Sequence, residues 1–252
     1  MNAYETLADC YDELTYDIPY DGILEFWEML CRRMSRPVET VVDLACGTGS
    51  LSVRLAKKGY SVIGADISPE MLTVAAKKAE DMENAPYFIC QPMQKLELAE
   101  PVDGVLCCLD SINYVTSITE CKKTFRRVFE ALKPGGLFFF DINSPAKLIG
   151  QSGQVFMDER ENTFCTWWAD YTERSRICSY GMDIFRREGE LWRRSYEEHY
   201  EFAYTPEELT EFLQEAGFSA VFLYADRVFR KPDPDEKRIY FAARKGAKWT
   251  AD

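Results

Sequence analysis

Apolar segments with strand-like and helix-like spacing alternate between residues 38 and 143. Apolar runs rich in β-branched or aromatic residues predict strands at residues 38–44, 60–67, 87–91, 102–109 and 137–142. Apolar residues at helical spacing predict helices between them, at residues 50–58, 69–81 and 118–132. Strands that alternate with helices are typical of a parallel sheet covered by helices.

Polar residues and a glycine mark the ends of these helices. Ser68 precedes Pro69, which predicts a serine N-cap with proline at the first helical position. Ser117 lies three residues before Glu120, which is the spacing of a capping box. Gly59 ends the first helix, because glycine adopts the left-handed conformation of a helix C-terminus without strain.

The pattern changes after Ser144. Residues 154–204 hold 12 of the chain's aromatic residues, which comprise 16 Phe, 5 Trp and 14 Tyr. They lie in strand-like runs that break near Glu173 and at Gly189. These runs predict an antiparallel insertion.

Helix and strand patterns return after the insertion. Thr205 and Glu208 have capping-box spacing, and the helix that they begin ends before Gly217. Apolar runs then predict strands at 218–224 and 238–244. The patterns together predict an α/β fold, with a Rossmann-like, mostly parallel seven-stranded sheet, helices on both faces, and an antiparallel β insertion before the last helix and two strands. Because two halves of one sheet flank the insertion, we expect it over the carboxyl ends of the strands, where such sheets bind ligands.

Composition narrows the classes of partner. The 252 residues include 30 basic and 42 acidic residues, for a formal net charge of −12, which opposes binding to nucleic acid or an anionic membrane. The nine cysteines show no C-x-x-C spacing, so we expect free thiols rather than disulfides or a metal site. We find no signal-peptide pattern and no apolar run of about 20 residues, and therefore expect a soluble, cytoplasmic protein.

A glycine-rich turn connects the first predicted strand to the first predicted helix. Gly47 and Gly49 nearly match the dinucleotide-binding pattern, and Asp66 stands where a ribose-binding acid belongs. A nicotinamide-dependent oxidoreductase is therefore one interpretation. Asp43 argues against it, because a carboxylate at the end of the strand would repel the pyrophosphate of a dinucleotide. A cationic ligand without phosphate, such as S-adenosylmethionine, fits this carboxylate.

Several spaced motifs resemble those of class I S-adenosylmethionine-dependent methyltransferases, and among these the small bacterial enzymes that methylate small molecules. The resemblance covers roughly residues 4–143 and 205–245, and its motifs lie at 41–49, 64–68, 90–93, 107–114 and 132–136. Residues 7–21 also resemble the family's leading helix, which closes over the cofactor. The chain departs from the family at Ala45, where a further glycine is common, and at Pro92, where an acid is common.

The resemblance implies S-adenosylmethionine as the cofactor and assigns residues to it. By similarity, Asp66 takes the ribose hydroxyls and Ile67 packs on adenine. Pro92 offers neither an acceptor side chain nor a backbone N–H, so adenine recognition falls to the N–H of Met93 with Gln91. The implied cofactor-binding residues are Tyr11, Tyr20, Asp43, Ala45, Gly47, Gly49, Asp66, Ile67, Met71, Gln91, Met93 and Leu109.

The resemblance further implies methyl transfer to an O or N atom of a small molecule by in-line displacement. The protein then mainly aligns donor and acceptor and excludes water. Where the acceptor must lose a proton, the expected catalytic residues are Tyr11, Asp110 and His199, with Tyr114 as a further candidate. The insertion's aromatic residues are expected to divide between an acceptor pocket and the interior of a small sheet: Trp167, Trp168, Tyr171, Trp192, Tyr196 and Tyr200.

We expect one methyltransferase domain over residues 1–252. Within it, an N-terminal helix (1–35) covers the cofactor, residues 36–143 bind it, the β insertion (144–204) forms a lid, and residues 205–245 complete the sheet. The expected partner is a small-molecule methyl acceptor, with no nucleic acid and no membrane, and the protein is a monomer or homodimer. A non-catalytic S-adenosylmethionine-binding module is the alternative interpretation, and the oxidoreductase is a less favoured one.

Overall fold

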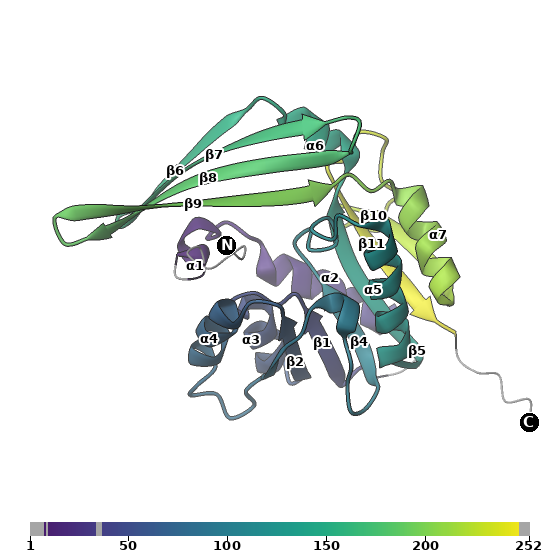
Figure 1. Cartoon of the computed structure of the whole chain (residues 1–252). Coiled ribbons are helices and arrows are strands. Elements are labelled where there is room, and N and C mark those ends of the chain that lie inside the picture. Colours follow the sequence, from purple (N-terminus) through teal and green to yellow (C-terminus); the bar gives the residue numbers. More distant parts are fainter. Residues whose placement is uncertain (1–7, 9, 34–36, 247–252) are drawn as a thin grey trace, which may run out of the picture.

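One sheet of seven strands has the spatial order β10-β11-β5-β4-β1-β2-β3 (Figure 1). The computed structural model describes residues 8, 10–33 and 37–246. The strands of this sheet are β1 (Thr40–Leu44), β2 (Ser61–Asp66), β3 (Tyr87–Cys90), β4 (Val102–Cys107), β5 (Leu132–Asn143), β10 (Phe218–Ala225) and β11 (Arg238–Lys245). Strands β1 to β5 pair in parallel, and β10 and β11 pair antiparallel. The predicted Rossmann-like sheet is confirmed, and its order reverses between β1 and β4, where such sheets bind ligands.

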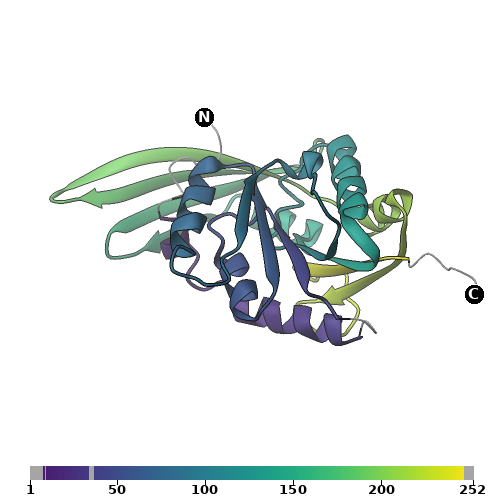
Figure 2. The same ribbon diagram turned by 90° about the horizontal axis from the view of Figure 1, so that it is seen from below.

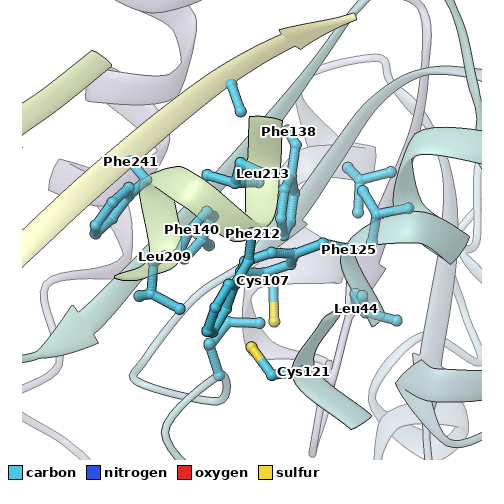
Figure 3. Packing of buried hydrophobic residues seen from close by; sticks show 14 of the residues in the cluster. Leu44, Cys107, Cys121, Phe125, Phe138, Phe140, Leu209, Phe212, Leu213 and Phe241 are labelled. Carbon is cyan, nitrogen blue, oxygen red and sulfur yellow. The ribbon is translucent and has the colours of Figure 1, made fainter. Parts of the chain in front are cut away.

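Helices cover both faces of this sheet, as Figure 2 shows. The longer helices are α2 (Tyr20–Arg33), α3 (Ser50–Lys57), α4 (Pro69–Lys78), α5 (Ile118–Ala131) and α7 (Pro206–Ala216). One apolar cluster joins α2 and α3 to the sheet, and a second joins α5 and α7 to it. In the second cluster, Phe125 of α5 and Leu213 of α7 lie around Phe138 and Phe140 of β5 (Figure 3). None of the described helices has the length and apolar character needed to cross a bilayer.

The predicted N-caps are confirmed. The hydroxyl of Ser68 accepts the Met71 N–H at 3.2 Å, and Pro69 is the first residue of α4. Ser117 caps α5 in the same way. At α7 a full capping box forms, in which Thr205 and Glu208 each accept the backbone N–H of the other. These local bonds explain why the helix starts were predictable from sequence.

Strand β5 begins earlier than predicted, at Leu132 rather than residue 137. It follows α5 directly, and Val102 pairs with Leu132 before a register shift brings Gly104 opposite Leu137. Strand β4 conversely ends at Cys107 and not at Leu109. Leu109 has a φ of 61°, which is incompatible with a continuing strand.

The N-terminal segment holds two helices where one was predicted over residues 1–35. Helix α1 (Tyr11–Leu14) is short, and α2 starts at Tyr20, directly after Pro19. Proline disfavours helical conformation in the residue before it, which accounts for the break. Helix α2 buries Phe26 and Trp27 against the sheet, so α1, the linker and the start of α2 at Tyr20 are the parts of this segment that lie near the carboxyl ends of the strands. Residues 1–7, 9, 34 and 35 of the predicted helix lie outside the described residues.

The predicted antiparallel insertion is confirmed as a separate four-stranded sheet, which we call the lid sheet. Its strands are β6 (Val155–Glu159), β7 (Thr163–Thr172), β8 (Ile177–Glu188) and β9 (Leu191–Phe202). In Figure 1 the lid sheet extends over the carboxyl ends of the parallel strands, with α1 between the two layers. A helix that was not predicted, α6 (Pro145–Gln151), precedes it, with Ser144 as its N-cap.

Candidate functional site

A cavity of about 720 Å³ lies between the carboxyl ends of the parallel strands and the lid sheet. From the parallel sheet it is lined by Asp43 and Ala45 at the end of β1 and by Asp66 at the end of β2. From the lid sheet it is lined by His199 and Glu201 of β9. The two layers therefore meet in one space, at the position where the strand order reverses.

The glycine-rich turn presents open backbone to this cavity. Gly47 has a φ of 53°, and a Cβ built on it would meet no atom within 4 Å. A ligand can therefore approach the main chain closely at this residue. Ala45 also has a positive φ, 58°, although it carries a Cβ, so this turn holds a strained alanine.

Gly49 has a different role from the one expected. It does not line the cavity, and it precedes α3 with a φ of 72°. A Cβ at this residue would lie 2.8 Å from the Cβ of Ala75 and 3.2 Å from Cζ of Phe88. Gly49 thus allows α3 to pack closely against α4 and β3, and the expectation that it contacts the cofactor does not fit this position.

Asp66 fixes the turn from the neighbouring strand. Its Oδ2 accepts the N–H of Gly47 at 2.8 Å, and its Oδ1 accepts the N–H of Ser68 at 2.8 Å. Burial raises the pKa of Asp66, and these backbone hydrogen bonds oppose that rise. Ile67 follows with 67% of its surface exposed and lines the cavity. An acid and an exposed apolar side chain therefore stand side by side at the end of β2.

Asp43 is almost fully buried, with 3% of its surface exposed. Its Oδ2 accepts a hydrogen bond from the hydroxyl of Ser52 at 2.5 Å. Burial raises the pKa of Asp43 to about 7, and the neighbouring Asp66 carboxylate adds to the rise. A cation bound beside Asp43 would lower this pKa again, whereas an anion would raise it further. The electrostatics of the crevice thus favour a positively charged ligand.

The loop after β4 holds two consecutive residues in the left-handed region. Leu109 has a φ of 61° and Asp110 a φ of 54°, and both line the cavity. Their N–H groups donate to the Asp141 carboxylate at 2.7 and 3.1 Å. Arg238 pairs with Asp141 and, at 2.7 Å, with Asp110. The Asp110 carboxylate is therefore held in an ion pair with Arg238.

Helix α1 is tied to the glycine-rich turn through Asp12. Its carboxylate accepts the hydroxyls of Thr48 at 2.7 Å and Ser50 at 3.2 Å, and it pairs with Nζ of Lys78 at 2.7 Å. Tyr11 and Tyr20 line the cavity on either side of this contact. These bonds connect the N-terminal segment to the same turn that faces the cavity.

Most residues expected to bind the cofactor line the cavity, but Gln91 does not. Its side-chain amide donates to the Glu97 carbonyl at 3.3 Å and accepts the Glu97 N–H at 3.0 Å, so the side chain is engaged outside the cavity. The expected role of Gln91 in adenine recognition does not fit this position. The residues from that set that line the cavity are Tyr11, Tyr20, Asp43, Ala45, Gly47, Asp66, Ile67, Met71, Met93 and Leu109.

The inner face of the lid sheet is more polar than the aromatic composition suggested. On β9, Glu197, His199 and Glu201 are buried, with 8%, 3% and 3% of their surfaces exposed. Tyr196 and Tyr200, which alternate with them, are exposed at 40% and 45%. Successive residues of a strand point to opposite faces, so the tyrosines lie on the outer face.

Six aromatic side chains of the insertion were expected to divide between an acceptor pocket and the interior of a small sheet, and only two of them take such positions. Trp167 does line the cavity, and Tyr171 packs in a small apolar cluster with Leu148. The others are well exposed, namely Trp168, Trp192, Tyr196 and Tyr200.

A buried network of hydrogen bonds forms the wall of the cavity beneath the lid sheet. Asn143 donates from Nδ2 to Glu201 Oε2 at 2.8 Å. The Oδ1 of Asn143 accepts from Lys147 Nζ at 2.7 Å and from Arg238 at 3.1 Å. Burial raises the pKa of Glu201 to about 8 and lowers the pKa of Lys147.

Sequence reasoning missed Glu201, Lys147 and Arg238. The Ser144-Pro145 cap marks the helix that carries Lys147, and the alternation of charged and aromatic residues along β9 marks the strand that carries Glu201, but neither pattern shows that these side chains face the cavity, and no local pattern marks Arg238.

The expected catalytic residues Tyr11, Asp110 and His199 all line this one cavity, as does Tyr114. The His199 Nε2 lies 3.2 Å from Glu197 Oε2, and the ring stands edge-on to Tyr114 with 6.0 Å between ring centroids. His199 therefore has a carboxylate neighbour that can orient its ring.

All nine cysteines are free thiols, as expected. Cys107 and Cys108 are fully buried at the end of β4, and burial raises the pKa of both thiols well above the ordinary value, which makes them unreactive. Within the described residues, no group of three or more His, Cys, Asp or Glu side chains is placed to hold a metal ion.

Residues 41–136 match the family model described as "Methyltransferase domain". The chain is 34% identical over 246 residues to YqeM of Bacillus subtilis strain 168, which is named as a methyltransferase, and the match covers 96% of this chain and 97% of that protein. A protein of Geobacillus sp. strain WCH70 that is also named as a methyltransferase is 32% identical over 246 residues, and this match covers 96% of this chain and 99% of that protein. A crystal structure of an S-adenosylmethionine-dependent methyltransferase from Clostridium acetobutylicum ATCC 824 superposes with a TM-score of 0.87 at 31% identity, covering 98% of this chain and all of that one.

Proposed function

The chain belongs to the class I S-adenosylmethionine-dependent methyltransferases, and on that premise we propose that it transfers a methyl group to an oxygen or nitrogen atom of a small molecule. The observation that carries the proposal is the shared cavity. One wall is the glycine-rich turn, and the opposite wall is the polar inner face of the lid sheet. A volume of about 720 Å³ falls in the range of pockets that take small ligands.

The residues of the turn fit S-adenosylmethionine. Gly47 offers the open backbone that a close ligand requires, and Asp43 offers a buried carboxylate to a cation. We propose that Asp66 accepts the ribose hydroxyls, that Ile67 packs on adenine, and that the Met93 N–H contacts the adenine ring. When bound, the cofactor would supply a methyl group activated by the positive charge on the sulfonium sulfur that carries it.

In this proposal, the other cavity residues that were predicted to bind the cofactor contact the methionine part of S-adenosylmethionine. Gly47 and Leu109 both line the cavity, and we propose that their main-chain carbonyl groups accept hydrogen bonds from the ammonium group of the methionine part. Tyr11 and Tyr20 approach the same region from the N-terminal segment. Ala45 and Met71 contribute surface in contact with the cofactor.

The protein's main contribution is to position the acceptor and exclude water. Orienting two reactants accounts for a large share of the barrier reduction in such reactions. We propose that residues 1–252 act as one domain. In this domain residues 144–204 form a lid over the cavity, and the N-terminal segment of residues 1–35 covers the bound cofactor. The hydrogen bond that the Thr48 hydroxyl donates to Asp12 supports this closing role.

Calorimetric titration tests the proposal. The protein should bind S-adenosylhomocysteine and show no heat of binding with NADH, because Asp43 repels a pyrophosphate. Incubation with S-adenosylmethionine and small-molecule extract should then release S-adenosylhomocysteine. Binding of NADH instead would overturn the proposal, and binding of the cofactor without turnover over a broad acceptor panel would favour the non-catalytic binding module.

A further inference from the structure

We propose that the methyl acceptor is an amine that enters the cavity as an ammonium ion, and that Glu201 accepts its proton before the methyl group is transferred. This inference rests on the proposed function and adds the substrate class and a catalytic residue to it. It starts from the position of one carboxylate. Glu201 is 3% exposed, lines the cavity, and comes from the lid sheet that faces the glycine-rich turn.

Glu201 belongs to a row of polar residues on the cavity side of β9. Glu197, His199 and Glu201 share this face, and their neighbours on β8 are Met182, Tyr180 and Cys178. An inner sheet face is normally apolar, because burying a charged group without a partner costs free energy. Glu201, the glutamate of this face that lines the cavity, therefore indicates that the cavity is built to receive a polar or cationic group.

The cations near Glu201 are engaged elsewhere. Arg238 pairs with Asp110 and Asp141, and Lys147 donates to the Asn143 amide. Within the part of the chain that the structure describes, Glu201 receives a hydrogen bond from Asn143 and pairs directly with neither cation. An ammonium ion from the acceptor would supply the missing direct partner.

The charge balance around Glu201 points the same way. When Glu201 ionises as a cation binds beside it, Asp110, Asp141 and Glu201 carry three negative charges against the two positive charges of Arg238 and Lys147. The titratable or charged groups that influence Glu201 or are influenced by it are Asp110, Lys147, Cys178, Tyr180 and Arg238, and His199 is its near neighbour on β9. A cationic acceptor neutralises the excess negative charge, whereas an anionic phenolate or carboxylate increases it.

Acid strength distinguishes an amine from a hydroxyl acceptor. Proton transfer is efficient when donor and acceptor have similar pKa values. Burial raises the pKa of Glu201 to about 8. Ammonium groups have pKa values of about 8 to 10, which is close to this value. An alkyl hydroxyl resembles water and is a far weaker acid than an ammonium ion, so a buried carboxylate cannot deprotonate it effectively.

The proposed step balances in atoms and charge. The N–H bond of the ammonium ion breaks, its electron pair stays on nitrogen, and the proton forms an O–H bond with the Glu201 carboxylate. The nitrogen lone pair then forms the new N–C bond as the C–S bond breaks and leaves its pair on sulfur. The products are a methylated ammonium ion, neutral thioether and a protonated Glu201, which later releases its proton to water.

The identity of the methylated atom gives the first test. The protein is incubated with the small-molecule fraction of a cell extract and S-adenosylmethionine that carries a carbon-13 methyl group, and the product is examined by NMR and mass spectrometry. We expect an N-methyl product. Label on oxygen, sulfur or carbon would overturn the inference, although the protein would still be a methyltransferase. The inference would also be overturned if S-adenosylhomocysteine binds but no labelled amine forms. Failure to bind S-adenosylhomocysteine would instead overturn the proposed function.

Variants give the second test, with the amine identified in this way. Glu201→Gln should lower kcat/KM at neutral pH by about a hundredfold or more while S-adenosylhomocysteine affinity changes little. Glu201→Asp, which keeps a carboxylate, should recover part of the loss. The control is Glu198→Gln, on the exposed outer face of the same strand, where Tyr196 and Tyr200 contact the side chain. Its kcat/KM should equal that of the unaltered protein.

The pH profile separates proton transfer from a structural role. The unaltered protein should show a bell-shaped profile, because activity requires an ionised Glu201 and a protonated amine. Glu201→Gln should instead show a rate that rises continuously with pH, because only amine already free of its proton can react. An unchanged bell-shaped profile in Glu201→Gln would overturn the inference even where the activity falls.

Discussion

The carboxylate of Asp141 accepts the backbone N–H of Leu109 at 2.7 Å, and this bond joins a fully buried residue of β5 to the rim of the cavity. Leu109 and the following Asp110 both have left-handed backbone conformations, which cost free energy for residues with a side chain. Asp141 also pairs with Arg238, so one buried acid stabilises both the strained loop and the buried cation. The shape of the cavity at this point therefore depends on a residue of the core.

Asp141→Asn should lower both stability and cofactor affinity. The amide keeps the size of the side chain but removes the charge that compensates Arg238, and breaking a buried ion pair costs about 3–5 kcal/mol. The loop at Leu109 also loses an acceptor. Urea denaturation and calorimetric titration with S-adenosylhomocysteine measure the two effects.

Asp103→Asn serves as the matched control for Asp141→Asn. Asp103 is also a buried acid, and it pairs with Lys133 at 3.0 Å, but it does not line the cavity. This variant should be less stable but bind S-adenosylhomocysteine normally while folded. Equal losses of affinity in both variants would contradict a specific role for Asp141.

S-adenosylmethionine should bind more tightly as the pH rises through 7. Burial holds the pKa of Asp43 at about 7 in the ligand-free protein, and a bound cation lowers it, so binding releases a proton. Affinity should therefore rise about tenfold between pH 6 and 8, which follows from a free-state pKa near 7 and a bound-state pKa well below 6. Calorimetry across this range measures it. In Asp43→Asn the affinity should be weaker and the contribution of this residue to the pH dependence absent.

Asp43→Asn should also stabilise the ligand-free protein at pH 8. The folded pKa of Asp43, about 7, lies above the unfolded value of 3.8, so the folded state binds more protons than the unfolded state between these values. The contribution of Asp43 to the free energy of unfolding therefore falls as the pH rises from 4 to 7. Above pH 7 the carboxyl group is ionised in both states, and the full cost of burying its charge is present. Asp43→Asn should raise the free energy of unfolding at pH 8 by about 1–3 kcal/mol and change it little at pH 4. An unfolding free energy at pH 8 no higher than that of the unaltered protein would contradict this account.

The sheet and the helix starts were predictable because their determinants are local. The hydroxyl of Ser68 caps α4 by accepting the N–H of a residue only three positions along the chain. Strand β4 is buried along its whole length, so its apolar run in the sequence is continuous. The loop at Leu109 was not predictable in this way. Its backbone conformation is held by Asp141, 32 positions away, and no local preference of leucine favours a positive φ.

The polar wall of the cavity was missed for a related reason. Arg238 and Asn143 are 95 positions apart and become neighbours only when β11 pairs with β5. On β9 the pattern alone leaves open which alternate residues face inward, because a shift of one residue exchanges the two faces. The general preference for burying aromatic residues predicted Tyr196 and Tyr200 inside, whereas the structure buries the charged set that includes Glu201.

Two alanine substitutions should separate the roles of the two glycines in the turn. Gly47→Ala adds a methyl group where no atom lies within 4 Å, so it should cost only about 1–2 kcal/mol of stability for its positive φ but weaken S-adenosylhomocysteine binding about tenfold or more. Gly49→Ala places a Cβ 2.8 Å from the Cβ of Ala75, so it should destabilise the protein more strongly, by about 2–4 kcal/mol. Urea midpoints and calorimetric dissociation constants provide the comparison. Loss of binding in Gly49→Ala alone would reverse this assignment.

Asp12→Asn should speed cofactor release while leaving stability nearly unchanged. Asp12 is partly exposed, and exposed ion pairs such as the one with Lys78 contribute little to folding, about 1 kcal/mol at most. Its bonds to Thr48 and Ser50, however, hold α1 against the turn that faces the cavity. Losing about 1 kcal/mol from this closed arrangement should raise the dissociation rate of S-adenosylhomocysteine about fivefold, which stopped-flow measurement detects. Asp17→Asn, an exposed acid of the same segment, is the control and should leave the rate unchanged. Equal rates in Asp12→Asn and the unaltered protein would show that α1 does not retain the cofactor.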